Sequence, residues 1–391
     1  MTAFVYVCLY VIMLFLLFIS GRNISKRKNN VIKASLLGII AFSLNEGLRF
    51  GRGLDYNYYA REYEYVVNTH KSTWDICFAE IAKFLGSMDI PWQGYVFLMS
   101  LVLIVSGVLF VNNFKDVSKW ALPLFAVFTM PAENLMRWFF GWSIILIGLS
   151  FILDKRDRKS VFIFIALSVI ACLIHFGLFP IIIVYFTLFF INKPLLKPYW
   201  SIAIFLAIAL IFNTSFMERF IDIMNLISIN ERTDYYVRNT EYWLTGGYAG
   251  NTKSAFPKYY EFLLFLVNIW FGYKLTKYLN SKFIYLYNLF LLGFITYPIC
   301  RQIELLFRYN NLFTLFQFVI LAYIVQEIVR KRILIFQNKY MLVLSFLIIL
   351  NYFRVLLFTP FYDTPDHFLY IWDSNGRDYL DPYIYWIKDM K

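Results

Sequence analysis

The residues most able to do chemistry are charged side chains that stand at the ends of apolar runs. The first stretch carries Arg49, Arg52 and Asp55, with glycines between them that permit a tight backbone. A guanidinium group binds phosphate oxygens in a bidentate manner and keeps its charge at any relevant pH. The stretch therefore predicts a phosphate site, and an Arg–Asp pair that only fixes the loop is the alternative.

A second set of charged residues borders later apolar runs. Arg137 follows Asn134 between two apolar segments, and Arg301, Glu304 and Arg308 share one face of a predicted helix. At such positions an arginine either binds phosphate or extends its long side chain to lipid headgroups. The helix face with Arg301, Glu304 and Arg308 predicts either a strip of salt bridges or a phosphate site. Gathered at one outer cavity, these arginines and those of the first stretch would suit a lipid pyrophosphate.

His175 is the one histidine that lies within an apolar run. The ordinary pKa of a histidine, about 6.5, suits proton transfer from a sugar hydroxyl. We therefore predict His175 as the catalytic base, with Asp55 as the second candidate; Asp55 could instead orient Arg49. The simpler alternative for His175 is a side chain at a helix end that bonds to a carbonyl.

The composition is that of an integral membrane protein. Hydrophobic residues make up 60% of the 391 and charged residues 16%, whereas a soluble domain is about half apolar and a quarter charged. The formal charge of +12 comes from short basic clusters between apolar runs, a pattern that sets membrane orientation and argues against nucleic-acid binding. The 4 cysteines show no C-x-x-C spacing, so they indicate neither a metal site nor a disulfide framework.

The apolar runs predict an all-α, polytopic transmembrane bundle of about twelve spans, because one span needs about 20 apolar residues. We expect residues 1–358 to form this bundle as one domain and residues 359–391 to form an extracytoplasmic aromatic tail. The predicted spans are Thr2–Ser20, Val31–Leu48, Trp92–Val111, Trp120–Ala132, Leu135–Leu153, Ser160–Ile174, Phe176–Ile191, Tyr199–Asn213, Tyr259–Lys277, Phe283–Cys300, Tyr309–Val329 and Tyr340–Phe358.

The orientation of the bundle follows from its charges. With the N-terminus outside, every predicted inner loop is short and basic, as the positive-inside rule requires. The long segments 49–91 and 214–258 and the tail then lie outside, where we expect the chemistry. No basic residue precedes the first run, which therefore predicts a retained span rather than a signal peptide.

One long apolar run needs division. The stretch from 161 to 191 exceeds an ordinary span, and His175, Gly177 and Pro180 supply a break. We therefore predict two short helices on either side of His175.

Residues 49–59, which read RFGRGLDYNYY, resemble a known signature. They are similar to the R-x-x-x-G-x-D-Y-x-x-Y pattern of EpsG-like proteins, which are relatives of the Wzy polymerases of O-antigen and capsule. Leu54 stands where many members have threonine, and this change leaves the glycine and the aspartate of the pattern in place.

The resemblance extends over most of the chain. Asn134-x2-Arg137 resembles the N-x-x-R of the family at the start of a middle span, His175 resembles its histidine after the next span, and Arg308 resembles its arginine near the last pair of spans. Trp138 stands where many members have glutamine, which removes a hydrogen-bonding partner of the neighbouring arginine.

The resemblance implies a membrane-embedded, GT-C-like glycosyltransferase that needs neither a metal nor another cofactor. Its donor would be a saccharide chain on undecaprenyl pyrophosphate, its acceptor a lipid-linked repeat unit, and its location the outer face of the bacterial cytoplasmic membrane. Arg49, Arg137 and Arg308 would bind the pyrophosphate, with Arg52 and Arg301 next. Membrane lipid, a chain-length regulator and a flippase are candidate partners.

Three alternatives stay open. A related ligase would move glycan from the same donor to another acceptor. A transferase that uses a polyprenyl-monophosphate sugar often carries paired acids and a metal in its first outer loop, and Asp55, Glu62 and Glu64 form no compelling pair. A flippase or transporter of lipid-linked oligosaccharide would show repeat symmetry, which the sequence lacks.

Overall fold

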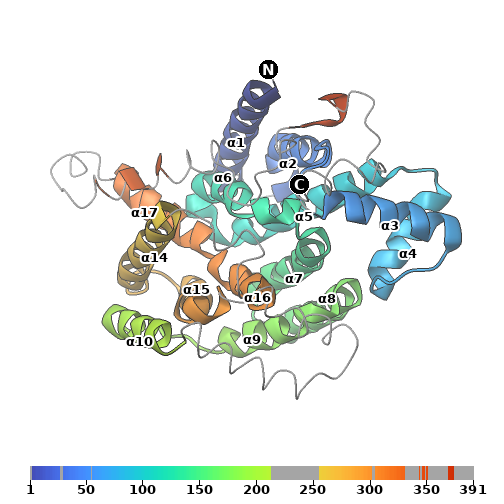
Figure 1. Cartoon of the computed structure of the whole chain (residues 1–391). Helices are drawn as coiled ribbons and strands as arrows, with labels where there is room; N and C mark the ends of the chain where they lie inside the picture. The colour runs from blue at the N-terminus through green and yellow to red at the C-terminus, as the bar shows by residue number, and fades with distance from the viewer. Residues whose placement is uncertain are drawn as a thin grey trace, which may run out of the picture. The chain divides into compact units, whose positions relative to one another are not determined.

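The computed structural model describes residues 2–26, 30–53, 55–212, 255–301, 304–330 and 369–373, together with positions 343, 346–347 and 349–350. Every regular element in these ranges is helical, and their one β pairing is an isolated bridge between Arg49 and Tyr370 (Figure 1). The chain divides into two compact units, Met1–Ile182 with Ile349–Lys391, and Ile183–Ile348. Most of the predicted outer loop 214–258, of the last span and of the tail lies outside the described residues.

The first unit is built from helices that coincide with the apolar runs. Helix α1 packs on α2 and α6, α2 packs on α5, α5 on α7, and α7 on α8. Their bounds are α1 Thr2–Lys26, α2 Val31–Gly47, α5 Trp92–Val111, α6 Ser118–Phe128, α7 Met136–Asp154 and α8 Arg158–Ile174, with the 3-10 turns η1 Asn112–Val117 and η2 Met130–Glu133. The predicted spans of this region are therefore helices.

The first predicted outer segment folds into a helical hairpin. Helices α3 (Tyr56–Thr69) and α4 (Ile76–Ser87) lie side by side and also contact α5 (Figure 1). Aromatic rings hold the hairpin in place: Tyr59 stacks on Trp92 at 6.4 Å, and Trp74 meets Phe78 edge-on at 4.8 Å. Such pairs add to the free energy of area burial. These contacts give the first residues of α3 and α4 fixed positions.

The predicted break at His175 is confirmed. Helix α8 ends at Ile174, a 3-10 turn η3 (Phe176–Leu178) follows, and α9 runs over Phe179–Phe189. His175 itself is extended, with φ −154° and ψ 103°. The histidine is therefore held at a helix end.

The second unit centres on α15. This helix (Ser281–Cys300) contacts α10 (Pro198–Ile211), α16 (Glu304–Thr314) and α17 (Gln317–Arg330), and α17 also contacts α14 (Ala255–Leu275). The sequence predicted Tyr309–Val329 as one continuous span. The structure interrupts that helix with a turn at Leu315 and Phe316.

Several helices are able to cross a membrane. Among the described residues, 5 are long and apolar enough by length and composition, and two apolar helices are shorter. The protein is therefore a multi-pass membrane protein, while the expected number of about twelve spans and the GT-C-like arrangement stay predictions. The five are Phe4–Lys26, Trp92–Phe128, Met136–Asp154, Ser281–Cys300 and Leu306–Arg330.

Candidate functional site

Glycine sets the shape of the loop between α2 and α3. Gly51 and Gly53 have φ angles of 64° and 94°, which residues with a side chain rarely adopt. A Cβ at Gly53 would lie 2.7 Å from the carbonyl oxygen of Glu133. Only glycine meets both conditions, so Gly53 lets this loop rest against the backbone that leads into α7.

The same approach joins two of the sequence motifs. The side-chain Oδ1 of Asn134 accepts a hydrogen bond of 2.9 Å from the backbone N–H of Asp55, which lies 79 positions earlier in the chain. Asp55 directly precedes α3, so this bond holds the start of that helix. This bond therefore joins the arginine-bearing loop to the short segment between η2 and α7.

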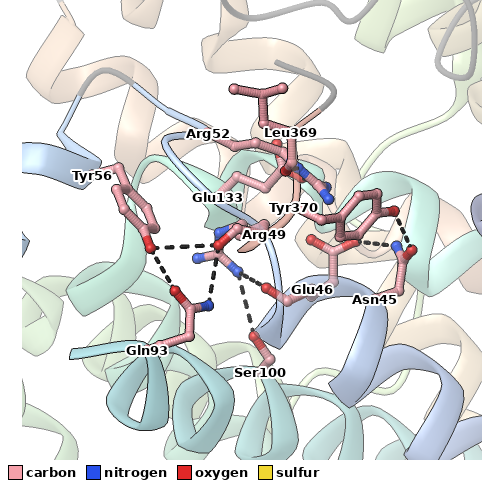
Figure 2. A network of polar contacts seen from close by, with 10 residues as sticks. All are labelled: Asn45, Glu46, Arg49, Arg52, Tyr56, Gln93, Ser100, Glu133, Leu369 and Tyr370. Atoms are coloured by element: carbon pink, nitrogen blue, oxygen red, sulfur yellow. Dashed lines mark hydrogen bonds and ion pairs between the residues drawn. The ribbon is translucent and has the colours of Figure 1, made fainter. Parts of the chain in front are cut away.

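Arg52 is fully buried and has several partners (Figure 2). Its Nη1 lies 3.0 Å from Glu133 Oε1, and its Nε donates to the carbonyl of Leu369 at 3.1 Å. The guanidinium carbon stands 4.4 Å from the ring centre of Tyr370 and 5.1 Å from that of Tyr6. These partners compensate a charge that is costly to bury and fix Arg52 within the loop, while its role in pyrophosphate binding stays a prediction.

Residues 369–371, here called the C-terminal strap, cover this loop. Two backbone hydrogen bonds join the strap to Leu48 and Phe50, at 3.0 and 3.1 Å. Tyr370 is 1% exposed, and its hydroxyl donates to Asn45 Oδ1 at 2.6 Å (Figure 2). A segment from the far end of the chain therefore completes the surroundings of Arg52.

Arg49 is anchored mainly through its backbone. Its carbonyl oxygen accepts hydrogen bonds from Gln93 Nε2 at 3.1 Å and from the hydroxyl of Tyr56 at 3.4 Å. Its Nη1 donates to the backbone carbonyl of Glu46 at 2.6 Å and to Ser100 Oγ at 3.4 Å (Figure 2). The guanidinium group thus has a fixed position without a bond to either nearby carboxylate.

The charge of Arg49 is buried but incompletely satisfied. The residue is 4% exposed, and its Nε has no hydrogen-bond partner among the residues the structure describes. Burial lowers the pKa of the Arg49 guanidinium from its ordinary value, and the charges of Glu46 and Glu133 offset only part of that effect. A buried donor without a partner costs about 1–3 kcal/mol, and more when it is charged. An anion beside Arg49 would remove this cost.

A cavity opens at Arg49. It lies between α2, α5, α6, η2 and α7, and its volume of about 20 Å³ has room for about one water-sized group. Most of its wall is apolar, and Arg52 is not part of it. The polar lining consists of Glu46, Arg49, Ser100, Thr129 and Glu133. The cavity is therefore a narrow, largely apolar opening with one arginine in its wall.

The two carboxylates of this cavity are not among the residues predicted from the sequence. Glu46 and Glu133 are 8% and 6% exposed, and their side chains lie close enough to interact directly. The carboxylate of Glu46 accepts a hydrogen bond of 2.9 Å from Asn45 Nδ2. Acids at the borders of apolar runs were the available signal, but nothing local indicated that the two would meet.

Arg137 and His175 lie on neighbouring elements of the first unit. Arg137 Nη1 stands 3.3 Å from Asp75 Oδ2, with both side chains 16% exposed, so the pair ties the start of α4 to α7. Trp138 contacts the ring of His175 edge-on at 4.9 Å. His175 Nδ1 accepts the N–H of Gly177 at 3.1 Å, which requires a lone pair on Nδ1 and places the proton of the neutral ring on Nε2.

The remaining predicted arginines belong to the second unit. Arg301 follows α15, and its guanidinium carbon lies 5.6 Å from the ring centre of Tyr297, whereas Arg308 lies within α16. Their convergence with Arg49 stays a prediction. In the part of the chain that the structure describes, no group of three or more His, Cys, Asp or Glu side chains could hold a metal ion.

Apolar helices, a buried arginine–carboxylate cluster and a cavity beside it define a multi-pass helical membrane protein with a polar site inside its first unit. A family model supplies the next step: it matches residues 32–363, and the chain belongs to the EpsG family. This range includes the arginine loop, α7, His175 and α16. No curated protein and no solved structure matches the chain significantly.

Proposed function

We propose that the protein is a glycan polymerase that joins oligosaccharide repeat units carried on undecaprenyl pyrophosphate. A hydroxyl of the acceptor unit attacks the anomeric carbon of the donor chain, and undecaprenyl pyrophosphate leaves. The reaction takes place on the outer face of the bacterial cytoplasmic membrane and builds O-antigen, capsule or exopolysaccharide. Membership of the EpsG family supports a polysaccharide polymerase of this kind.

The observation that carries the proposal is the Arg49 guanidinium at the cavity wall. A pyrophosphate leaving group needs its developing charge stabilised, and a preorganised donor in a water-poor site does this without a metal. Arg137, Arg301 and Arg308 are the further arginines proposed for this role, and Arg52 holds Arg49 in place.

The test is complementation in a host whose own copy of the gene is deleted, with surface glycan length read on gels. We expect the wild-type chain to restore long polymer and Arg49→Ala to leave single repeat units on the surface. Loss of one such donor costs roughly 10²–10³-fold in rate. Arg49→Lys should recover little, because an ammonium group lacks the fork that binds two oxygens.

Arg330→Ala is the matched control, since that side chain is 59% exposed and is not part of the cavity wall. It should restore polymer as the wild type does. Long polymer from Arg49→Ala at normal expression would refute the proposal. A deletion host with no repeat units on its surface, rather than single units, would indicate a flippase.

A further inference from the structure

We propose that Glu46, with Glu133 beside it, accepts the proton of the attacking sugar hydroxyl. The inference rests on the proposed function and assigns it a catalytic base. Glu46 and Glu133 line the same cavity as Arg49, so a donor whose pyrophosphate lies against Arg49 brings its anomeric carbon toward these carboxylates.

The two carboxylates are held differently. Glu133 Oε1 is paired with Arg52 at 3.0 Å. The carboxylate of Glu46 accepts an amide hydrogen bond from Asn45, and Arg49 donates to the backbone carbonyl of Glu46 rather than to its side chain. A carboxylate in an ion pair is a weak proton acceptor, whereas burial beside a like charge favours proton uptake. Of the two, Glu46 is therefore the better base.

The geometry of His175 favours a different role for that residue. Its Nδ1 already accepts the N–H of Gly177, so the neutral ring presents Nε2–H. That group donates a hydrogen bond to an anion rather than taking a proton. His175 is also not part of the cavity wall that Glu46 shares with Arg49.

The step balances in atoms and charge. The acceptor oxygen forms a bond to the anomeric carbon, and the bond from that carbon to the phosphate oxygen breaks, with its electron pair on the leaving pyrophosphate. The hydroxyl proton moves to a carboxylate oxygen of Glu46 and is later released to the departing pyrophosphate. The titratable and charged groups whose fields act on or beside Glu46 are Glu133, Arg49, Arg52, Tyr6, Tyr10 and Tyr370.

The experiment measures polymer formation against pH in membrane vesicles that contain the full-length protein and the lipid-linked repeat units of the host. We expect Glu46→Gln to polymerise about 10²–10⁴-fold more slowly than the wild type, since this is the usual contribution of a general base. The fall of the wild-type rate at acid pH should disappear in this variant. Glu46→Asp keeps a carboxylate and should keep both part of the rate and the acid limb.

Binding separates a missing base from a damaged site. Inorganic pyrophosphate should raise the melting temperature of purified Glu46→Gln as much as that of the wild type, because Arg49 is intact. Glu80→Gln, on a side chain that is 61% exposed, is the control and should match the wild type in rate and pH profile.

The outcomes distinguish the two proposals. If the wild-type chain makes no polymer in the deletion host, the proposed function fails and this inference falls with it. If the wild type polymerises, Arg49→Ala does not, and Glu46→Gln polymerises within a few-fold of the wild type with an unchanged acid limb, only the inference is wrong. Loss of the pyrophosphate shift in both Glu46→Gln and Glu46→Asp would mean a structural role and would also overturn it.

Discussion

Arg49 and Arg52 lie in the same loop and are both buried, yet their surroundings differ. Arg52 has a carboxylate, a backbone carbonyl and two aromatic rings around it, whereas Arg49 has no bond to a carboxylate and lines the cavity. Each arginine keeps one buried nitrogen, Nη2 of Arg52 and Nε of Arg49, without a hydrogen-bond partner within the described residues. The contacts of Arg52 compensate most of its buried charge. The contacts of Arg49 compensate less of its charge, so that a ligand can bind there. Stability and activity should therefore depend on different arginines.

The two alanine variants test this difference. Arg52→Ala breaks a buried ion pair and leaves Glu133 alone, which should lower the free energy of unfolding by about 3–5 kcal/mol. Arg49→Ala removes a poorly satisfied charge and should change it by less than about 1 kcal/mol while abolishing polymer. Chemical unfolding of both purified variants in detergent measures the contrast. Equal destabilisation would contradict this assignment of roles.

Gly53 provides a second comparison at the level of one residue. Gly53→Ala places a methyl group 2.7 Å from the Glu133 carbonyl at a φ of 94°, so we expect a loss of about 1–3 kcal/mol of stability. At Gly94 the added Cβ would lie 2.2 Å from Cγ2 of Ile90, a side-chain methyl group that a change of rotamer can move. Gly94→Ala is therefore the comparison and should cost less stability than Gly53→Ala, because no backbone atom and no left-handed φ is involved. Similar melting temperatures for the two variants would argue against the close approach.

At the scale of elements, the α3–α4 hairpin positions the residues of the site as much as the long helices do. Its first helix begins beside Asn134, and its second begins at Asp75, the partner of Arg137. The hairpin buries an aromatic face that includes Tyr56, Tyr63 and Phe78. The hairpin thus holds the end of the loop between α2 and α3, at the point where α3 begins.

A double-mutant cycle on Asp75 and Arg137 tests the link between the hairpin and α7. Because the two side chains are mostly buried and 3.3 Å apart, we expect a coupling energy of about 0.5–3 kcal/mol between Asp75→Ala and Arg137→Ala. Unfolding of the single and double variants in detergent gives the value. Additive effects would show that Arg137 does not depend on this partner.

The sequence predicted the long helices but not this hairpin. Apolar runs specify spans because lipid leaves a chain few alternatives, and the break at His175 followed from a glycine and a proline nearby. Helix α3 is short and carries many polar side chains beside its tyrosines, so the hairpin depends on packing against α5. The sequence pattern predicted Arg52 only as a ligand of pyrophosphate. Its contacts with Glu133 and Leu369 could not be predicted, because these residues are distant in sequence and only the fold brings them near.

At the scale of the whole molecule, orientation is the property that connects the helices to the proposed reaction. The predicted inner loops are basic, and the loop with Lys71 is predicted to face outward while that with Lys155 faces inward. Both lysines are exposed in the structure.

Labelling of single cysteines tests the orientation. In a background without the native cysteines, Lys71→Cys should react with a membrane-impermeant maleimide in intact cells, and Lys155→Cys should react only after lysis. Ala82→Cys, which is fully buried, is a control that should stay unlabelled in both conditions. Labelling of Lys155→Cys from outside would show that the bundle has the opposite orientation, with the site on the cytoplasmic face.

The strap has a consequence for biosynthesis. Arg52 and the Leu369 carbonyl that accepts its hydrogen bond are separated by 317 positions, and a chain is made and inserted from its N-terminus. The arginine loop is therefore delivered to the membrane long before its last partner leaves the ribosome. Each newly made molecule reaches this charge arrangement only once residue 369 has been made, so a chain that stops short of it lacks one partner of Arg52.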